Sequence, residues 1–441
     1  MFYENILKNY KFENLKKLYD FYCLKSIWEF IKTNNDNMKK ESKGLFRILS
    51  IDGGGIRGIL PGQIMVALEE KIQQKTGDKN ARIADYFDLI AGTSTGGILS
   101  CAYTCPGEDG RPKFSAQEAV DIYLEFGNSI FSTPLMQKIT SVIGLFGPKY
   151  PPFVLEKLLK EKLGDAKLSE SLSNIIIPSF TLDDGDTKFF TSSDAKKNKK
   201  DYFMWEVARS TSAAPTYFPA ASAGNLRDQM KGFIDGGVFA NNPTMCALVE
   251  AYKVDVDLHR KYHIEAKGIA GMSKGNSVLE NVFVLSLGTS NHETRYPFEK
   301  HAGKGVLGWI KPLIDIMMSG VSETVAYQTE QLFRLLRIQQ AETMLDSLPS
   351  DGTGAVEIIR EEIFEVLRYA QDAKKYHKEG DAILMHEPRP QYIRIEPDVG
   401  NANPDMDDAS KGNLQLLKEA GAAAAKKHDK WLDLAAEQLI R

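Results

Sequence analysis

Two glycine-rich turns constrain the fold of this chain more than any other feature of its sequence. The first turn, residues 53–55, follows the apolar run at residues 46–51 and precedes an expected helix. The second turn, residues 92–96, follows the apolar run at residues 87–91 and also leads into an apolar segment. Apolar strands that alternate with helices in this way are typical of an α/β protein, in which helices cover both faces of a mainly parallel sheet.

The second turn reads Gly92-Thr-Ser-Thr-Gly96, which fits the pattern Gly-x-Ser-x-Gly. Between a strand and a helix, this pattern is the nucleophile elbow, a turn so tight that the residues flanking the serine carry almost no side chain. The hydroxyl of Ser94 would then lie at a helix N-terminus, where the helix dipole favours developing negative charge. A plain glycine-rich loop is the alternative, but the strand before the turn and the helix after it favour the elbow.

The first turn, Gly53-Gly-Gly-Ile-Arg-Gly58, leaves backbone N–H groups unshielded by side chains, so that they can bind a phosphate or an oxyanion. Its spacing also fits the dinucleotide fingerprint G-x-G-x-x-G. That fingerprint needs an acidic residue about twenty positions on, at the end of the next strand. Here this position falls at residues 69–71, inside the expected helix, and no Gly-Lys-Ser/Thr closes a P-loop. We therefore favour an oxyanion hole, because the second turn supplies a nucleophile for it.

A third segment, residues 231–243, places Asp235 at the end of a short apolar strand, directly before Gly236 and Gly237. A carboxylate at a strand end, with no bulky side chain after it, can approach a second loop closely. Asp235 is therefore a candidate base for the Ser94 proton. An ordinary Asp-Gly turn is the alternative interpretation of this segment taken alone.

Together and in this order, residues 52–58, 92–96 and 235–237 resemble the patatin-like phospholipase family. Weaker similarity at residues 212–219, 241–243, 285–289 and 406–410 extends the resemblance from about residue 46 to about residue 410. The resemblance implies a patatin-like, three-layer α/β/α fold with a mainly parallel central sheet. It also implies a serine lipid acyl hydrolase that uses a Ser–Asp dyad. Carried over residue by residue, it implies a nucleophile at Ser94, a base at Asp235, an oxyanion hole at Gly53, Gly54, Gly55 and Arg57, and motif glycines at Gly58, Gly92, Gly96, Gly236 and Gly237.

Composition narrows the possible partners. The chain has 441 residues, of which 43% are hydrophobic and 26% charged, with a net charge of −4. These values are ordinary for a globular protein and argue against nucleic-acid binding. The four cysteines form no metal-binding pattern with histidines, and the proposed chemistry needs no metal or cofactor. We expect a lipid substrate and transient contact with a membrane surface, and the oligomeric state stays open.

The N-terminal residues lack the basic start and unbroken apolar core of a signal peptide, and no run approaches the roughly twenty apolar residues that span a bilayer. We therefore expect a cytoplasmic or peripheral membrane protein. Residues 1–44 are predicted to form an extension that is partly helical or disordered. Residues 45–250 are predicted to form the catalytic core, and residues 251–441 to complete it with late strands and C-terminal helices.

Two apolar segments are ambiguous. Residues 127–152 are broken by glycine, serine and proline, which suits either a buried loop or a flap that contacts lipid. Residues 305–318 form a Trp-bearing helical stretch, which we predict to complete the core rather than to lie at an interface, with Pro312 breaking the helix.

Two alternative functions remain open at this stage. All seven histidines follow Asp235, so that a Ser, Asp, His triad in α/β-hydrolase order is conceivable. None of them lies in a glycine-flanked loop, which argues against that order. The glycine-rich loop could also bind a nucleotide, which would make the protein a ligand-sensing module or a nucleotide-activated phospholipase effector.

Overall fold

The computed structural model describes residues 45–132, 147–198, 201–224, 230–262, 281–290, 296–348 and 391–440, together with residues 357, 360, 361, 363 and 364. The chain divides into two units, residues 45–336 with 381–441 and residues 337–380 with 1–44. The sheet and the candidate site belong to the first unit. The predicted N-terminal extension lies outside the described residues, as do residues 133–146, the centre of the segment that suits either a buried loop or a flap.

Strand β1 (Phe46–Ile51) lies inside an eight-stranded sheet. Strand β2 (Leu89–Gly92) runs parallel to it on one side and β7 (Val282–Leu287) runs parallel on the other. The register pairs Ile51 with both Gly92 and Leu287, so the carboxyl ends of the three strands are level. The loops that follow these strands therefore meet at one edge of the sheet, where ligands bind in open α/β proteins.

The remaining strands extend the sheet in the order β5-β6-β3-β2-β1-β7-β8, with β4 beside β3. Strand β8 (Tyr392–Ile395) is parallel to β7, and β3 (Asn174–Thr181) is parallel to β2. The other pairings are antiparallel and involve β4 (Asp186–Thr191), β5 (Ala221–Gly224) and β6 (Met230–Asp235). The predicted mainly parallel sheet is thus confirmed, with antiparallel strands at one end.

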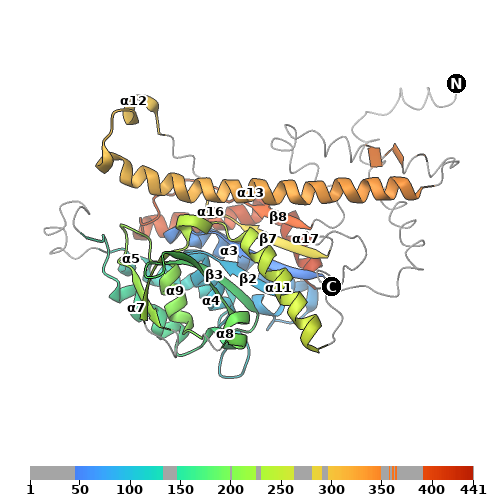
Figure 1. The fold of residues 1–441 in the computed structure, drawn as a ribbon, viewed down its shortest axis with the longest axis horizontal. Helices are drawn as coiled ribbons and strands as arrows, with labels where there is room; N and C mark the ends of the chain where they lie inside the picture. The colour runs from blue at the N-terminus through green and yellow to red at the C-terminus, as the bar shows by residue number, and fades with distance from the viewer. Residues whose placement is uncertain are drawn as a thin grey trace. The chain divides into compact units, whose positions relative to one another are not determined.

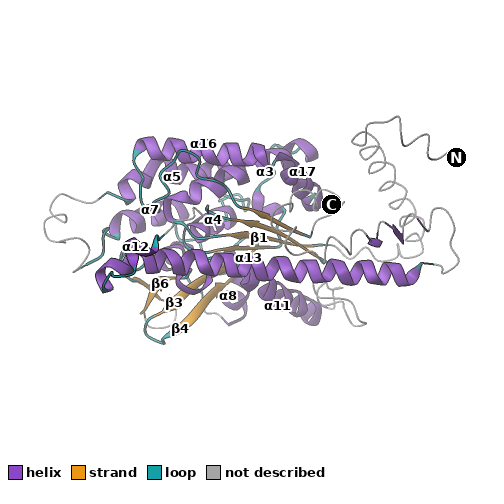
Figure 2. Cartoon of the chain, turned by 90° about the horizontal axis from the view of Figure 1, so that it is seen from above, coloured by secondary structure: helices purple, strands orange, loops and turns teal. Residues whose placement is uncertain are grey.

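Helices cover both faces of the sheet (Figures 1 and 2). Alternate residues of β1 point to opposite faces, as the pleat of a strand requires. Leu49 and Ile51 join the core under one group of helices, whereas Phe46 and Ile48 join the core under another. The first group is α3 (Ile59–Thr76), α4 (Thr95–Thr104), α5 (Ala116–Ile130), α16 (Lys411–Lys427) and α17 (Asp429–Leu439), and the second includes α11 (Thr244–Tyr262). The predicted three-layer α/β/α arrangement is confirmed.

Two further helices, α7 (Phe153–Leu163) and α9 (Met204–Thr211), pack around β3 and β4 and form their own apolar cluster. Short helices complete the described chain: η1 (Gly55–Gly58), η2 (Ile83–Asp85), η3 (Leu168–Glu170), α8 (Ser192–Asn198), α10 (Gly237–Ala240) and α12 (Phe298–His301).

The long helix α13 (Val306–Ser347) differs from the sequence prediction in two ways. It continues through Pro312, because one missing N–H removes a single hydrogen bond from a helix of 42 residues. Its early part is also not simply core. Pro312 and Met318 are buried. Four other apolar side chains in this part of the helix are 39–53% exposed: Ile310, Leu313, Ile316 and Met317. Among the described residues, no helix has both the length and the apolar character needed to cross a membrane.

Candidate active site

Ser94 lies in a strained turn between β2 and α4. Its backbone angles, φ 53° and ψ −119°, are rare for a residue with a side chain and mark a position held by its surroundings. A Cβ atom added to Gly92 would lie 2.1 Å from the carbonyl oxygen of Gly96, and one added to Gly96 would lie 2.2 Å from that of Ile51. Only glycine fits at these two positions, so the turn can be this tight.

The backbone of Ser94 is fixed from the neighbouring helix α9. Its N–H donates to Thr211 Oγ1 at 3.0 Å, and this hydroxyl donates in turn to the carbonyl of Pro178 at 2.6 Å. Thr93 adds a bond from its own hydroxyl to the carbonyl of Ala240 at 2.6 Å. The turn is thus tied to β3 and to the segment after Asp235.

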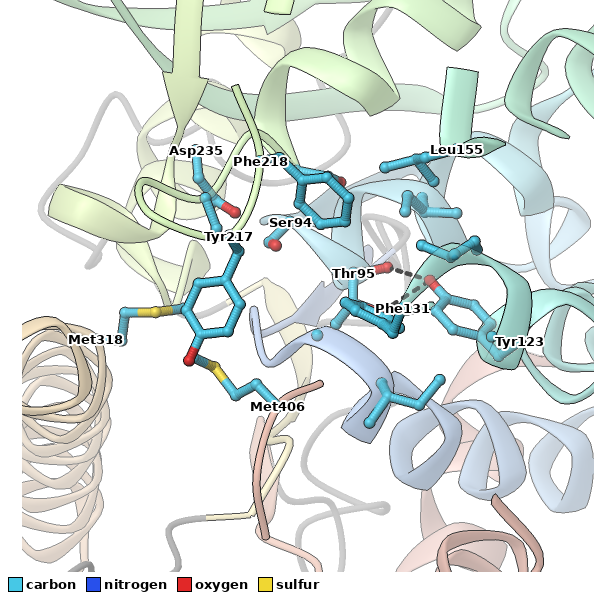
Figure 3. Close-up of a pocket in the computed structure, with 17 residues that line it drawn as sticks. Ser94, Thr95, Tyr123, Phe131, Leu155, Tyr217, Phe218, Asp235, Met318 and Met406 are labelled. Atoms are coloured by element: carbon cyan, nitrogen blue, oxygen red, sulfur yellow. Dashed lines mark hydrogen bonds between the residues drawn. The ribbon is translucent and has the colours of Figure 1, made fainter. Parts of the chain in front are cut away.

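Asp235 ends β6 and is 1% exposed. Its N–H donates to the carbonyl of Ala213 at 3.1 Å, and its Oδ1 accepts a bond from the amide of Gly237 at 2.7 Å. Its second oxygen, Oδ2, is buried without a hydrogen-bond partner in the described part of the chain. Asp235 and Ser94 line the same pocket, where Figure 3 shows their side chains next to each other.

Burial raises the pKa of Asp235 from 3.8 to about 7. The hydroxyl of Ser94, the amide of Gly237 and the positive charge of Arg209 each lower this pKa, but they offset only part of the cost of burying the carboxylate. A carboxyl group with a pKa near neutrality can accept a proton more readily than an ordinary aspartate. The environment of Asp235 therefore suits a general base.

The glycine-rich loop lies against Ser94. A Cβ atom added to Gly53 would lie 3.2 Å from Ser94 Cβ. The N–H of Gly53 is already used, since it donates to the carbonyl of Asn241 at 3.0 Å. The amides of Gly54 and Gly55, by contrast, donate no hydrogen bond within the residues that the structure describes, and Gly55 lines the pocket.

Arg57 and Gly58 help to fix the position of this loop. The Arg57 guanidinium donates from Nε to the carbonyl of Gly54 at 3.3 Å and from Nη1 to the carbonyl of Ser290 at 3.2 Å. Burial lowers the pKa of Arg57, and nearby carboxylates oppose this effect. Arg57 does not line the pocket, whose lining residues are given below. A Cβ atom on Gly58 would lie 2.0 Å from Thr95 Oγ1, so this glycine allows the loop to approach the Ser94 turn.

An ion pair that sequence reasoning missed anchors the start of the glycine-rich loop. Arg394 of β8 donates to both carboxylate oxygens of Asp52, at 2.9 and 2.7 Å, and also to Ser286 and Glu396. Burial raises the pKa of Asp52 to about 6, although Arg394 lowers it. The sequence places Arg394 in a late strand, and only the pairing of β8 with β7 brings it near residue 52.

The pocket itself is mostly apolar. Figure 3 shows Tyr217, Met318 and Met406 on one side of Ser94 and Phe131 and Leu155 on the other. At the far side, the hydroxyl of Tyr123 donates to the carbonyl of Thr95 at 2.8 Å and accepts from Thr95 Oγ1 at 2.9 Å, so it has its own partners. The residues lining the pocket are Gly55, Ile56, Ser94, Thr95, Ile98, Tyr123, Gly127, Ile130, Phe131, Leu155, Ser212, Ala214, Tyr217, Phe218, Asp235, Met318 and Met406.

The structure describes only some of the alternative groups considered from sequence. In the described residues, no three His, Cys, Asp or Glu side chains lie close enough together to hold a metal ion. Of the seven histidines, the structure describes the surroundings of His301 and His428, and neither lines the pocket.

Comparisons with a protein-family model and with known proteins agree with this architecture. Residues 49–248 match the family model "Patatin-like phospholipase". The chain is 38% identical over 349 residues to patatin-like protein 2 of Arabidopsis thaliana, covering 74% of this chain and 82% of that protein. It is 36% identical over 314 residues to patatin-like protein 2 of Oryza sativa subsp. indica, covering 68% and 76%. A potato relative at 33% identity, covering 66% and 76%, is named probable inactive patatin-3-Kuras 1.

Proposed function

Because the chain belongs to the patatin-like phospholipase family, we propose that it is a serine lipid acyl hydrolase that cleaves fatty-acyl esters of phospholipids or related lipids. We further propose that Ser94 is the nucleophile and Asp235 the base. Family membership alone does not carry this proposal, since one relative is named probable inactive. The observation that carries it is the meeting of Ser94, in its strained turn, with a buried Asp235 in one apolar pocket.

The reaction proceeds by acyl transfer through Ser94. Its Oγ forms a bond to the ester carbonyl carbon, its proton moves to Asp235, and the carbonyl π electrons move onto oxygen. The oxyanion accepts hydrogen bonds from the N–H groups of Gly54 and Gly55. The carbonyl then re-forms, the bond to the alcohol breaks, and Asp235 returns the proton to the leaving oxygen. Water cleaves the acyl-enzyme by the same steps, and no step requires a metal or cofactor.

The lining of the pocket supports a fatty-acyl substrate. Most of the lining consists of aliphatic and aromatic side chains, among them Ile98, Ile130 and Leu155. Tyr123, one of the polar groups in the lining, is already bonded to Thr95. A hydrocarbon chain could therefore move from water into this pocket without breaking the hydrogen bonds of Tyr123.

The decisive experiment is fatty-acid release from mixed phospholipid vesicles by the purified protein, before and after treatment with a fluorophosphonate. We expect release by the untreated protein, its loss on treatment, and a phosphonyl adduct that peptide mass spectrometry maps to Ser94. Absence of release, or an adduct on another serine that abolishes it, would contradict the proposal.

The pH dependence of the reaction follows from Asp235. The base must be ionised before it can accept the Ser94 proton, and burial raises its pKa to about 7. We therefore expect kcat/KM for a water-soluble ester to rise tenfold per pH unit below this value and to level off above it, because kcat/KM reports the free enzyme. A profile already flat between pH 5 and 8 would argue against Asp235 as the base.

We propose that the early part of α13 makes the transient contact with a lipid surface. In the part of this helix before residue 318, the exposed side chains that the structure describes are all apolar, as given above. Further along, the exposed side chains are mixed: Glu323, Thr324 and Gln328 are polar, whereas Tyr327 and Leu335 are apolar. In the same segment, Ile314, Met317 and Met318 line a small second pocket that is also lined by Asp235. The apolar face thus adjoins the candidate site, so contact with a lipid surface would bring the substrate to it.

Leu313→Glu tests this contact. Leu313 is 53% exposed, and removing its burial in lipid costs about 1–2 kcal/mol, so we expect hydrolysis of vesicles to fall about tenfold. Hydrolysis of a water-soluble short-chain ester should not change. Leu335→Glu is the matched control, because Leu335 is 57% exposed on the same helix without lining either pocket.

Equal effects of Leu313→Glu and Leu335→Glu on vesicle hydrolysis would contradict a specific lipid-binding face. A parent protein that elutes as a dimer, and a Leu313→Glu variant that elutes as a monomer, would instead assign the face to a second copy of the chain.

A further inference from the structure

The peptide group between Gly53 and Gly54 is held by side chains that the proposed reaction does not use. The carbonyl of Gly53 accepts a hydrogen bond from Thr289 Oγ1 at 2.6 Å and a longer one from Asn241 Nδ2 at 3.4 Å. Thr289 is 5% exposed and follows the end of β7. Its hydroxyl is thus buried and directed at one carbonyl of the glycine-rich loop.

This bond determines where the next amide points. A trans peptide is planar, and its C=O and N–H point in opposite directions. The described residues contain no cis peptide bond. When Thr289 binds the Gly53 carbonyl, the N–H of Gly54 must therefore point away from Thr289. Without this bond, the peptide group between Gly53 and Gly54 could rotate easily, because glycine has no side chain to restrict its backbone.

The following peptide group shows the same arrangement. The carbonyl of Gly54 accepts bonds from Arg57, from the backbone N at 3.2 Å and from Nε at 3.3 Å. The N–H of Gly55 therefore points away from Arg57. Arg57 also binds the carbonyl of Ser290, the neighbour of Thr289, so one segment after β7 supports both peptide groups.

We infer that Thr289, assisted by Arg57, is a positioning residue that aims the amides of Gly54 and Gly55 at the oxyanion. The inference rests on the proposed function and deepens it. These amides donate no bond within the described chain, and Gly55 lines the pocket beside Ser94. Amides held in this way before the substrate arrives need no reorganisation as the charge develops, and this preorganisation is the main source of oxyanion stabilisation.

Thr289→Val and Thr289→Ser separate this role from a purely structural one. Valine removes the hydroxyl with little change of shape. The Gly53 carbonyl then loses its bond from Thr289, and the Gly54 amide is no longer held toward the oxyanion. We expect kcat for a water-soluble ester to fall about 10- to 100-fold with KM within twofold of the parent, since a whole oxyanion donor contributes 10²–10³ in kcat. Serine keeps the hydroxyl, and its kcat should stay within about threefold.

A trifluoromethyl ketone supplies the second readout. Ser94 adds to its carbonyl, the proton passes to Asp235, and the product carries an oxyanion like that of the transition state. Its inhibition constant should rise in Thr289→Val by the same factor as kcat falls, and it should stay unchanged in Thr289→Ser. If the Thr289→Val protein does not fold, Thr289→Ala replaces it in the comparison.

The inference and the proposed function fail in different ways. If Thr289→Val and Thr289→Ala keep parental kcat and inhibitor affinity, the positioning role is wrong, although hydrolysis by Ser94 stands. An increase in KM without loss of kcat would also overturn it. If the parent hydrolyses no ester or does not need Ser94, the proposed function itself fails.

Discussion

Replacing Ser94 by alanine is expected to reduce ester hydrolysis by about 10⁵-fold or more. The substitution removes the oxygen atom that forms the acyl-enzyme. The base that remains then has no hydroxyl group to deprotonate. The alanine has little structural cost, because the turn is fixed through the backbone N–H of Ser94, which alanine keeps. Stopped assays with a chromogenic ester and fatty-acid release from vesicles should show the same loss.

Ser210→Ala is a suitable control for this substitution. Ser210 is also fully buried, but its hydroxyl donates to the carbonyl of Glu206 within α9 at 2.7 Å and does not line the pocket. Its activity should stay within twofold of the parent. A Ser94→Ala protein that keeps a tenth of the parental rate would rule out Ser94 as the nucleophile.

Asp235→Asn is expected to reduce kcat by at least about 10⁴-fold while it stabilises the fold. An amide of the same shape can accept the bond from Gly237 at its oxygen but cannot accept the Ser94 proton. The loss of activity should not depend on pH between 6 and 9, because the titrating base is gone. A variant that retained a rate rising through pH 7 would return attention to a histidine as the base.

The gain in stability has a definite sign. Folding raises the pKa of Asp235 from 3.8 to about 7, so the native state binds more protons than the unfolded state between these values. This contribution to stability is complete below pH 3.8 and is lost as the pH rises to 7. At pH 8, the buried carboxylate destabilises the parent by up to about 4 kcal/mol. The asparagine avoids this cost but buries an unpaired amide at about 1–3 kcal/mol, which leaves a net gain of about 1–3 kcal/mol.

Urea unfolding of the parent and the Asp235→Asn variant at pH 5 and pH 8 measures this difference. The variant should gain relative to the parent as the pH rises, whereas Asp165→Asn, at an exposed position, should leave both stability and activity unchanged. A stability difference that is the same at both pH values would show that Asp235 is not buried as a carboxylate with a raised pKa.

The features that could be predicted from sequence are local ones. Gly92 and Gly96 have no room for a Cβ atom, so the tight turn around Ser94 leaves a clear pattern of glycines in the chain. The apolar strands on both sides of these turns indicate the sheet, because a strand buried on both faces is apolar along its whole length. The start of α5 also has a local signal, because Ser115 and Glu118 have the spacing of a capping box and form one in the structure.

What the sequence could not show depends on contacts between distant segments. Thr289 and Arg394 approach the glycine-rich loop only because β7 and β8 lie beside β1, and no local pattern reveals this order. The early part of α13 was predicted to be core, because apolar residues in a helix usually face one. Burial depends on what covers a residue, so the exposure of Leu313 could be learned only from the packed structure.

The contact between Ile56 and Met406 has a consequence for synthesis of the protein in the cell. The N–H of Ile56 donates to the carbonyl of Met406 at 2.8 Å, and an added Cβ atom on Gly55 would lie 2.2 Å from this same carbonyl oxygen. The glycine-rich loop leaves the ribosome long before the segment around Met406 that contacts it. A nascent chain that already carries Ser94 and Asp235 therefore still lacks this contact. We expect the loop to reach the arrangement described here only after residue 406 has been synthesised.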